Sequence, residues 1–199
     1  RSGKGRCGEE STFTVTALRS VGLAARQVYT PRWAHCDDNH AWVEVWVNGE
    51  WHFLGACEPE EKLDRGWFTG PAGQALLIHS RTFGDYAAGK REEVIGRDGA
   101  VVCHNVTASY TKTRKLRIQV RKQDNTPAAH AQVSVEILNM AEYFPAAMLE
   151  TDEQGETSIR LGLGDIRLQA RSEGKFVERY CNLAEDGVEA ADADCAVTL

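Results

Sequence analysis

The hydrophobic and polar positions in the first half of the chain predict a mixture of helix and strand. Apolar residues at three- and four-residue spacing predict a helix over residues 9–21, and Gly22 ends it. Residues 25–30 predict a short strand that runs into a proline. The apolar stretch 71–83 predicts a second helix, whereas the polar, glycine-rich stretch 84–99 predicts a connecting loop.

The clearest local signal in the sequence is a β-hairpin. Residues 40–47 alternate between two faces, with Val43 and Val45 on one and the tryptophans and Glu44 on the other. Asn48-Gly49 is the dipeptide that a type I′ turn prefers, and the chain then returns as a second strand. The tryptophans of this region either line a substrate groove or form the hydrophobic wall of the hairpin.

From about Tyr110 the pattern changes to short alternating strands with turn residues between them. The expected strands are residues 116–120, 131–138, 157–161, 166–170 and 175–181. Their near-regular spacing predicts an all-β antiparallel sandwich. The seam between the two halves is expected near residues 105–112.

Composition and charge exclude several classes of protein. The 199 residues are 42% hydrophobic and 26% charged, as in a folded globular chain. The formal net charge of −6 argues against a nucleic-acid partner, which would require a basic face. No apolar run approaches the roughly 20 residues that cross a bilayer. Because the sequence opens at Arg1 without Met, we expect an export signal or an upstream segment to precede it.

Cys7 and His40 are the residues best suited to nucleophilic chemistry. Cys7 lies in a small polar turn that leads into the first predicted helix, and a helix start favours a thiolate. His40 opens a strand directly after a polar loop, where an imidazole can be both held and exposed. Read alone, each residue more often has a structural role, Cys7 as a packing cysteine and His40 as a strand-end histidine. His35 with Asp37 and Asp38 is too common a pattern to indicate a metal site, so no metal and no cofactor are expected.

The order of these motifs resembles the transglutaminase-like superfamily, whose fold is related to that of papain-like cysteine peptidases. The matching pieces are Gly5-Arg6-Cys7-Gly8, His40-Ala41-Trp42-Val43-Glu44-Val45 and Gly49-Glu50-Trp51. The likeness covers roughly residues 1–85. It implies that Cys7 is the nucleophile and His40 the general base, in a core that lacks its N-terminal part.

The third catalytic residue departs from the family pattern. The family places an Asp about fifteen residues after the His, and that count reaches Gly55, which carries no carboxylate. Glu58 is three residues later, and a bulged strand would bring it to His40 as the orienting group. Asp64 is the reserve. Alternatively, Glu58 is a solvated turn residue and Cys7 and His40 act as a dyad.

Two features of the second half complete the sequence-based expectations. Thr151-Asp152-Glu153-Gln154-Gly155 and the strands that follow resemble the carboxypeptidase regulatory-like, or transthyretin-like, β-sandwich, and nothing in this segment is expected to be catalytic. If the protein is exported, Cys181 and Cys195, which flank an acidic stretch over 185–194, are expected to form a disulfide.

Together these arguments predict an α+β protein with two domains. Residues 1–108 form a transglutaminase/papain-like core, a helix packed on an antiparallel sheet, and residues 109–199 form the β-sandwich. The expected function is cysteine-dependent acyl transfer, favouring hydrolysis of a peptide or glycopeptide amide through Cys7, His40 and Glu58. The alternative is a catalytically inactive binding or scaffold protein of the cell envelope. Expected partners are a peptide, protein or cell-wall peptide in a bacterial exported setting.

Overall fold

The first half of the chain builds one six-stranded sheet with a helix on it. A computed structural model describes residues 3–184 and 192–199. The elements are α1 (Cys7–Ser20), β1 (Ala25–Thr30), β2 (His40–Val47), β3 (Glu50–Leu54), α2 (Thr69–Ala72), β4 (His79–Phe83), β5 (Glu93–Asp98), β6 (Val101–Asn105) and the short 3-10 helix η1 (Thr107–Ser109). The strand order is β3-β2-β1-β4-β6-β5, and every pairing in this sheet is antiparallel.

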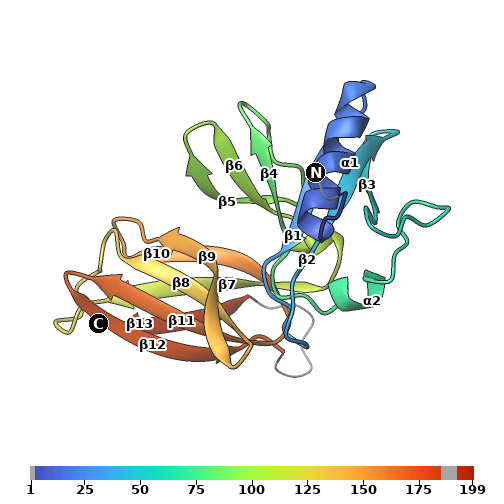
Figure 1. Cartoon of the computed structure of the whole chain (residues 1–199). Helices are drawn as coiled ribbons and strands as arrows, with labels where there is room; N and C mark the ends of the chain where they lie inside the picture. Colours follow the sequence, from blue (N-terminus) through green and yellow to red (C-terminus); the bar gives the residue numbers. More distant parts are fainter. Residues whose placement is uncertain (1–2, 185–191) are drawn as a thin grey trace.

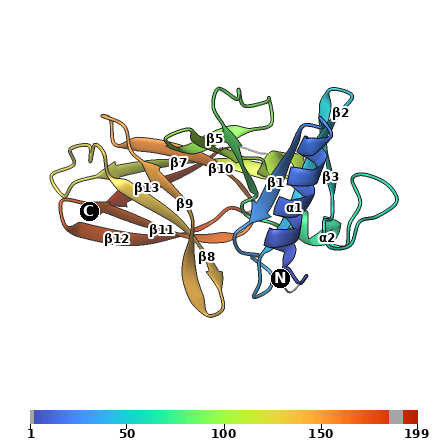
Figure 2. The ribbon, with the colours of Figure 1, turned by 45° about the horizontal axis from the view of Figure 1, so that its top comes forward.

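Helix α1 is fixed at its start and along one face. The Arg6 N–H donates to the Glu9 carboxylate (2.9 Å), which closes a capping box at the first turn. Val15 packs against Ala25 of β1 and Val43 of β2. The helix therefore lies over the half of the sheet formed by β1 to β3, and β4, β6 and β5 extend beyond it (Figure 1, Figure 2).

The hairpin predicted from residues 40–54 is confirmed. Asn48 (φ 52°) and Gly49 (φ 89°) both adopt the positive φ that a type I′ turn requires, and β2 and β3 pair directly across them. The strand predicted over 25–30 is also confirmed, as β1. The alternation of β2 does not separate a buried face from an exposed one, because residues 40–45 are all buried.

The second half folds into two further sheets around one core. The elements are β7 (Thr113–Arg121), β8 (Gln132–Asn139), β9 (Glu142–Glu150), β10 (Glu156–Gly162), β11 (Asp165–Ser172), β12 (Lys175–Asn182) and β13 (Ala193–Thr198). They form a three-stranded sheet, β10-β7-β13, and a four-stranded sheet, β12-β11-β8-β9. Ile118 and Ile159 of the first sheet and Val135 of the second belong to the same buried cluster. All pairings are antiparallel except β13 with β7, which is parallel.

The Thr-Asp-x-x-Gly motif is a tight turn that ties strands together. The Thr151 hydroxyl donates to the Ala128 carbonyl (2.7 Å) and accepts from the Ala131 N–H (2.8 Å). Gly155 has φ 74°, and a Cβ there would lie 2.5 Å from the backbone oxygen of Val120, so only glycine fits. This explains the residue types of the motif.

Two leucines connect the six-stranded sheet to the C-terminal core. Leu76 and Leu77 precede β4 in sequence but belong to the same buried cluster as the strands of the second half. The Gly162 N–H donates to the Leu76 carbonyl (2.9 Å), and a side chain at Gly162 would collide with the Ala75 carbonyl. The two halves therefore share packed residues.

The expected α+β fold class, with a transglutaminase/papain-like core of a helix packed on an antiparallel sheet, is wrong. The described part of the chain is mostly β, with 48% strand and 11% helix in two helices. The error lies between residues 71 and 99. The apolar stretch 71–83 is not a helix, since helix α2 ends at Ala72 and β4 begins at His79. The polar stretch 84–99 contains β5, an edge strand of the six-stranded sheet.

No helix among the described residues is long and apolar enough to cross a membrane.

Cys181 and Cys195 lie on β12 and β13, which belong to different sheets. Their Sγ atoms are 3.0 Å apart and both thiols are free. Either thiol can donate to the other, and the hydrogen bond with Cys181 lowers the pKa of Cys195 to about 7. The acidic stretch expected between these cysteines falls mainly on residues 185–191, outside the described residues.

We predict that oxidised glutathione converts this pair to a disulfide, with two thiols oxidised and one glutathione disulfide reduced. The bond closes a loop across a sequence separation of 14 residues. It should raise the free energy of unfolding by about 3 kcal/mol. Thermal unfolding before and after oxidation measures the gain, and Cys181→Ser is the control that should show none. If Cys181 and Cys195 could both still be alkylated after oxidation, the prediction would be contradicted.

Candidate active site

Cys7 is the first residue of α1 and is half-buried. The free N–H groups of the first helical turn carry partial positive charge there. The Gln27 side chain of β1 donates to the Gly8 carbonyl (2.9 Å) and to the Ser11 hydroxyl (2.7 Å), which fixes this turn on the sheet. The sequence thus places a thiol at an anchored helix start, as predicted.

Tyr29 and Cys57 lie close enough to Cys7 for a charge on its thiol to change their pKa values. Burial raises the pKa of Tyr29, and negative charge at Cys7 adds to the increase. Burial and then the Glu10 carboxylate raise the pKa of Cys57 to about 11. Cys57 is therefore a neutral thiol at pH 7, and the loop after β3 brings it close to the start of α1.

His40 opens β2 and is buried to 6% exposure by aromatic rings. Its ring centroid lies 4.7 Å from that of Trp67, 4.9 Å from Phe68 and 5.8 Å from Trp42. This desolvation lowers its pKa, and the Glu58 and Asp38 carboxylates only partly oppose the shift. His40 is accordingly neutral at pH 7, the form that accepts a proton.

Cys7 and His40 lie at the same end of the sheet but are not hydrogen-bonded. Tyr29, whose pKa responds to charge at Cys7, pairs across the β1–β2 ladder with Ala41, the residue after His40. Within the described part of the chain, neither the Cys7 thiol nor the His40 ring has a hydrogen-bond partner. Cys7 is half-buried and His40 is buried, and neither group is held in place by a hydrogen bond.

The loop that leads to His40 is held by the second half of the chain. The Asn139 side chain donates to the carbonyls of Trp33 (3.0 Å) and Cys36 (2.7 Å). The Met140 N–H donates to the Asp37 carboxylate (2.6 Å). The turn between β8 and β9 therefore fixes the entry to β2, a contribution that the sequence did not indicate.

Glu58 reaches the surroundings of His40 through Trp67. Its carboxylate accepts the Trp67 indole N–H (3.0 Å), and that indole packs on His40. The side chain is exposed and lies in the loop after β3, so the expected bulged strand is not observed. A Cβ at Gly55 would lie 2.9 Å from the Glu58 carbonyl oxygen. The space for an aspartate at position 55 is thus filled by the loop itself.

Asp64, the reserve orienting residue, is bound to a different histidine. Its carboxylate lies 2.6 Å from His52 Nδ1 and also accepts the Phe53 N–H (3.0 Å). The hydrogen bond with Asp64 raises the pKa of His52. Asp64 therefore fixes β3 to the loop after it.

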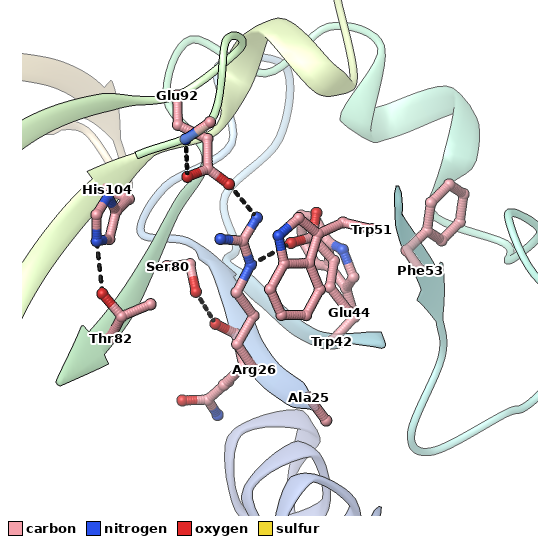
Figure 3. Close-up of polar contacts among 12 residues, drawn as sticks. Ala25, Arg26, Trp42, Glu44, Trp51, Phe53, Ser80, Thr82, Glu92 and His104 are labelled. Atoms are coloured by element: carbon pink, nitrogen blue, oxygen red, sulfur yellow. Dashed lines mark hydrogen bonds and ion pairs between the residues drawn. The ribbon is translucent and has the colours of Figure 1, made fainter. Parts of the chain in front are cut away.

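The Trp and Glu of the His-x-Trp-x-Glu stretch build a buried polar network (Figure 3). Arg26 of β1 is 2% exposed, and its guanidinium contacts Glu44 (2.6 Å) and Glu92 (2.7 Å). Tyr110 donates to the second Glu44 oxygen (2.6 Å) and accepts the Trp42 indole N–H (2.9 Å). Desolvation alone would lower the pKa of Arg26, but the two carboxylates outweigh it and raise the pKa instead.

The tryptophans divide between core and surface. Trp33 and Trp42 are buried, in one cluster with Phe68. Trp51 lies 4.1 Å from the Arg26 guanidinium, and Trp46 is 44% exposed. Trp33 and Trp42 therefore belong to the hydrophobic core, and Trp46 lies at the surface.

A second thiol–imidazole pair was missed in the sequence. Cys103 Sγ lies 3.7 Å from His79 Nδ1, on adjacent strands β6 and β4. Burial lowers the pKa of His79 to about 4 and raises that of Cys103. The pair is thus neutral at pH 7, a poor state for nucleophilic attack. Its residues are 24 positions apart, and a spacing of that kind carries no signal in a single sequence.

Comparison with known proteins supports the N-terminal motifs. Residues 1–56 match the family model of the transglutaminase-like superfamily. The matched range contains Cys7, His40 and Gly55, and it ends before Glu58. The chain matches no curated protein in sequence.

Among solved structures, this chain aligns with one described as "Structure of the Streptococcal ancillary pilin". The TM-score is 0.37 and the sequence identity 12%. The match covers 94% of this chain and 65% of that chain. At this level of similarity we draw no conclusion about the function of this chain. Residues 1–56 are thus the part of this chain that matches a known family model.

We predict that Glu44→Gln lowers the free energy of unfolding by about 3 kcal/mol, because it removes one charge of a buried pair while Arg26 stays buried. Chemical denaturation measures the loss. The matched control is Glu173→Gln, which breaks the exposed Lys122–Glu173 pair and should cost less than about 1 kcal/mol. Equal losses in the two variants would contradict the buried-network interpretation.

We also predict that two carboxylate substitutions each lower the pKa of a different histidine. Glu58→Gln removes a negative charge that favours the imidazolium, so the pKa of His40 should fall further below its ordinary value. Asp64→Asn should lower the pKa of His52 and leave that of His40 unchanged. NMR titration of the ring protons measures both. An unshifted His40 in Glu58→Gln would show that Glu58 does not act on it.

Proposed function

We propose that this chain carries out cysteine-dependent acyl transfer at an amide, with hydrolysis of a peptide or glycopeptide bond as its favoured outcome. One observation carries the proposal: the segment that matches the transglutaminase-like superfamily contains both Cys7 and His40. The geometry is consistent with it, because the thiol begins α1 and the imidazole begins β2 at the same end of the sheet.

In the proposed reaction, Cys7 Sγ attacks the amide carbon and His40 takes the thiol proton. First-turn N–H groups of α1 stabilise the oxyanion, since their partial positive charge faces the helix start. His40 then passes the proton to the leaving amine, and a thioester remains on Cys7. Water, or a second amine, resolves the thioester. Burial lowers the pKa of His40 and keeps the ring neutral at pH 7, the form that can accept a proton.

Glu58 is the proposed orienting group, acting through Trp67. Its carboxylate fixes the indole ring that packs on His40, and its charge favours the imidazolium that forms during the reaction. Solvent screens an exposed carboxylate, so this contribution is smaller than that of a buried aspartate. We therefore place most of the catalytic effect on Cys7 and His40.

A second candidate function rests on Gly55 and on the absence of a hydrogen bond between Cys7 and His40. A chain that has the superfamily's motifs but no aspartate at position 55 suits a binding or scaffold protein. The two functions differ in the reactivity they give Cys7.

We also propose export, since the closely spaced Cys181 and Cys195 suit an oxidising compartment.

The test is the rate at which iodoacetamide alkylates each cysteine, resolved by mass spectrometry. We expect Cys7 to react at least about tenfold faster than Cys36. Cys36 is an internal control, because it is exposed and its pKa is raised by partial burial and then by Asp38 and Asp37. His40→Gln should remove most of the advantage, and His35→Gln, in an exposed neighbour, should not. A Cys7 rate no faster than that of Cys36 would favour the binding protein.

A further inference from the structure

A cavity of about 460 Å³ opens beside α1, where the helix stops covering the sheet. Its lining includes Gly8 and Arg19 of α1, Gln27 and Tyr29 of β1, and His79 and Arg81 of β4. Gly8 follows Cys7 directly, and the pKa of Tyr29 responds to charge at Cys7. The cavity therefore begins next to the candidate nucleophile.

The charge of this cavity is opposite to that of the whole chain. Its lining contains two arginines and no carboxylate among the described residues, although the chain has a net charge of −6. Arg81 is exposed, and within the described ranges it takes part in no ion pair. Arg19 donates its Nε–H to the Ala25 carbonyl (2.8 Å), which fixes the side chain at the cavity wall. Such a cavity is complementary to an anion.

The strand register places Arg81 close to the start of α1. Val28 pairs with Ser80, so Arg81 stands opposite Gln27, and Gln27 donates to the Gly8 carbonyl. Arg81 is thus one strand away from the residue that fixes the first helical turn. An anionic group bound by Arg81 would therefore share the cavity with Gly8, the residue after Cys7.

We propose that this cavity binds a free carboxylate of the substrate, so that the preferred substrates are peptides with a terminal or side-chain carboxylate next to the amide that Cys7 attacks. The proposal rests on the proposed function of Cys7. Arg81 is a specificity-determining residue in this assignment, and Arg19 adds positive charge. An acidic peptide fits the cavity better than a neutral one because no lining carboxylate repels it.

The test uses two thiol reagents of equal length that differ in charge, N-iodoacetylglycine and N-iodoacetylglycinamide. In each, the Cys7 thiolate forms a bond to the methylene carbon and iodide leaves. After normalisation to the rates with glutathione, the carboxylate reagent should alkylate Cys7 about tenfold faster than the amide reagent. Site-resolved mass spectrometry separates Cys7 from the other thiols.

Two variants assign the preference to the cavity. Arg81→Gln should abolish the preference for the carboxylate reagent. Lys175→Gln changes the net charge equally, at β12, and should keep the preference. No preference in the unaltered protein, or a preference that survives in Arg81→Gln, would overturn the proposal.

A binding measurement separates this inference from the proposed function. In Cys7→Ala, N-acetylglycine should shift the NMR signals of the cavity residues and N-acetylglycinamide should not, and Arg81→Gln should remove the response. If Cys7 reacts slowly with both reagents, the proposed function fails. The NMR measurement would still show whether the cavity binds a carboxylate. Equal responses to the two ligands would overturn the carboxylate site.

Discussion

The burial of the Arg26 guanidinium is the constraint on which the six-stranded sheet depends. A buried charge is costly unless it is paired, and here it is paired by Glu44 of the neighbouring strand and Glu92 of the loop before β5. Glu44 and Arg26 stand directly opposite one another in the β1–β2 register. A slip of one residue would turn Glu44 to the other face of the sheet and leave Arg26 without it. The ion pair therefore specifies the register, and the same register sets His40 opposite Thr30.

This constraint gives the His-x-Trp-x-Glu stretch a physical meaning. Glu44 fixes the register through Arg26, and Trp42 joins the same network by way of Tyr110. His40, at the end of the strand, packs against Trp42 and stays free of hydrogen bonds in the described part of the chain. Trp42 and Glu44 thus fix the strand that His40 begins. Asn139, from the second half of the chain, fixes the loop that precedes His40.

Local patterns predicted the elements whose residues interact with sequence neighbours. The turn at Asn48-Gly49 and strands β1 and β2 depend on such patterns, and they are confirmed. The stretch 71–83 was misread as a helix because the apolar residues Leu76 and Leu77 serve a core formed by strands more than 30 residues away. Strand β5 was missed because an edge strand needs few apolar residues. The loop in which the Glu58 carbonyl approaches Gly55 depends on tertiary geometry, which residue spacing does not describe.

The choice between the two thiols near histidines follows from their surroundings. Cys103 is within 3.7 Å of His79, but it lies in the middle of a strand, and burial raises its pKa while it lowers that of His79. A thiolate there would lose solvation without gaining a compensating dipole. Cys7 is half-buried at a helix start, where free N–H groups favour negative charge, and an electropositive cavity opens beside it. Proximity to a histidine is therefore a weaker criterion for a nucleophile than an environment that favours its thiolate, and for this reason we propose Cys7 rather than Cys103.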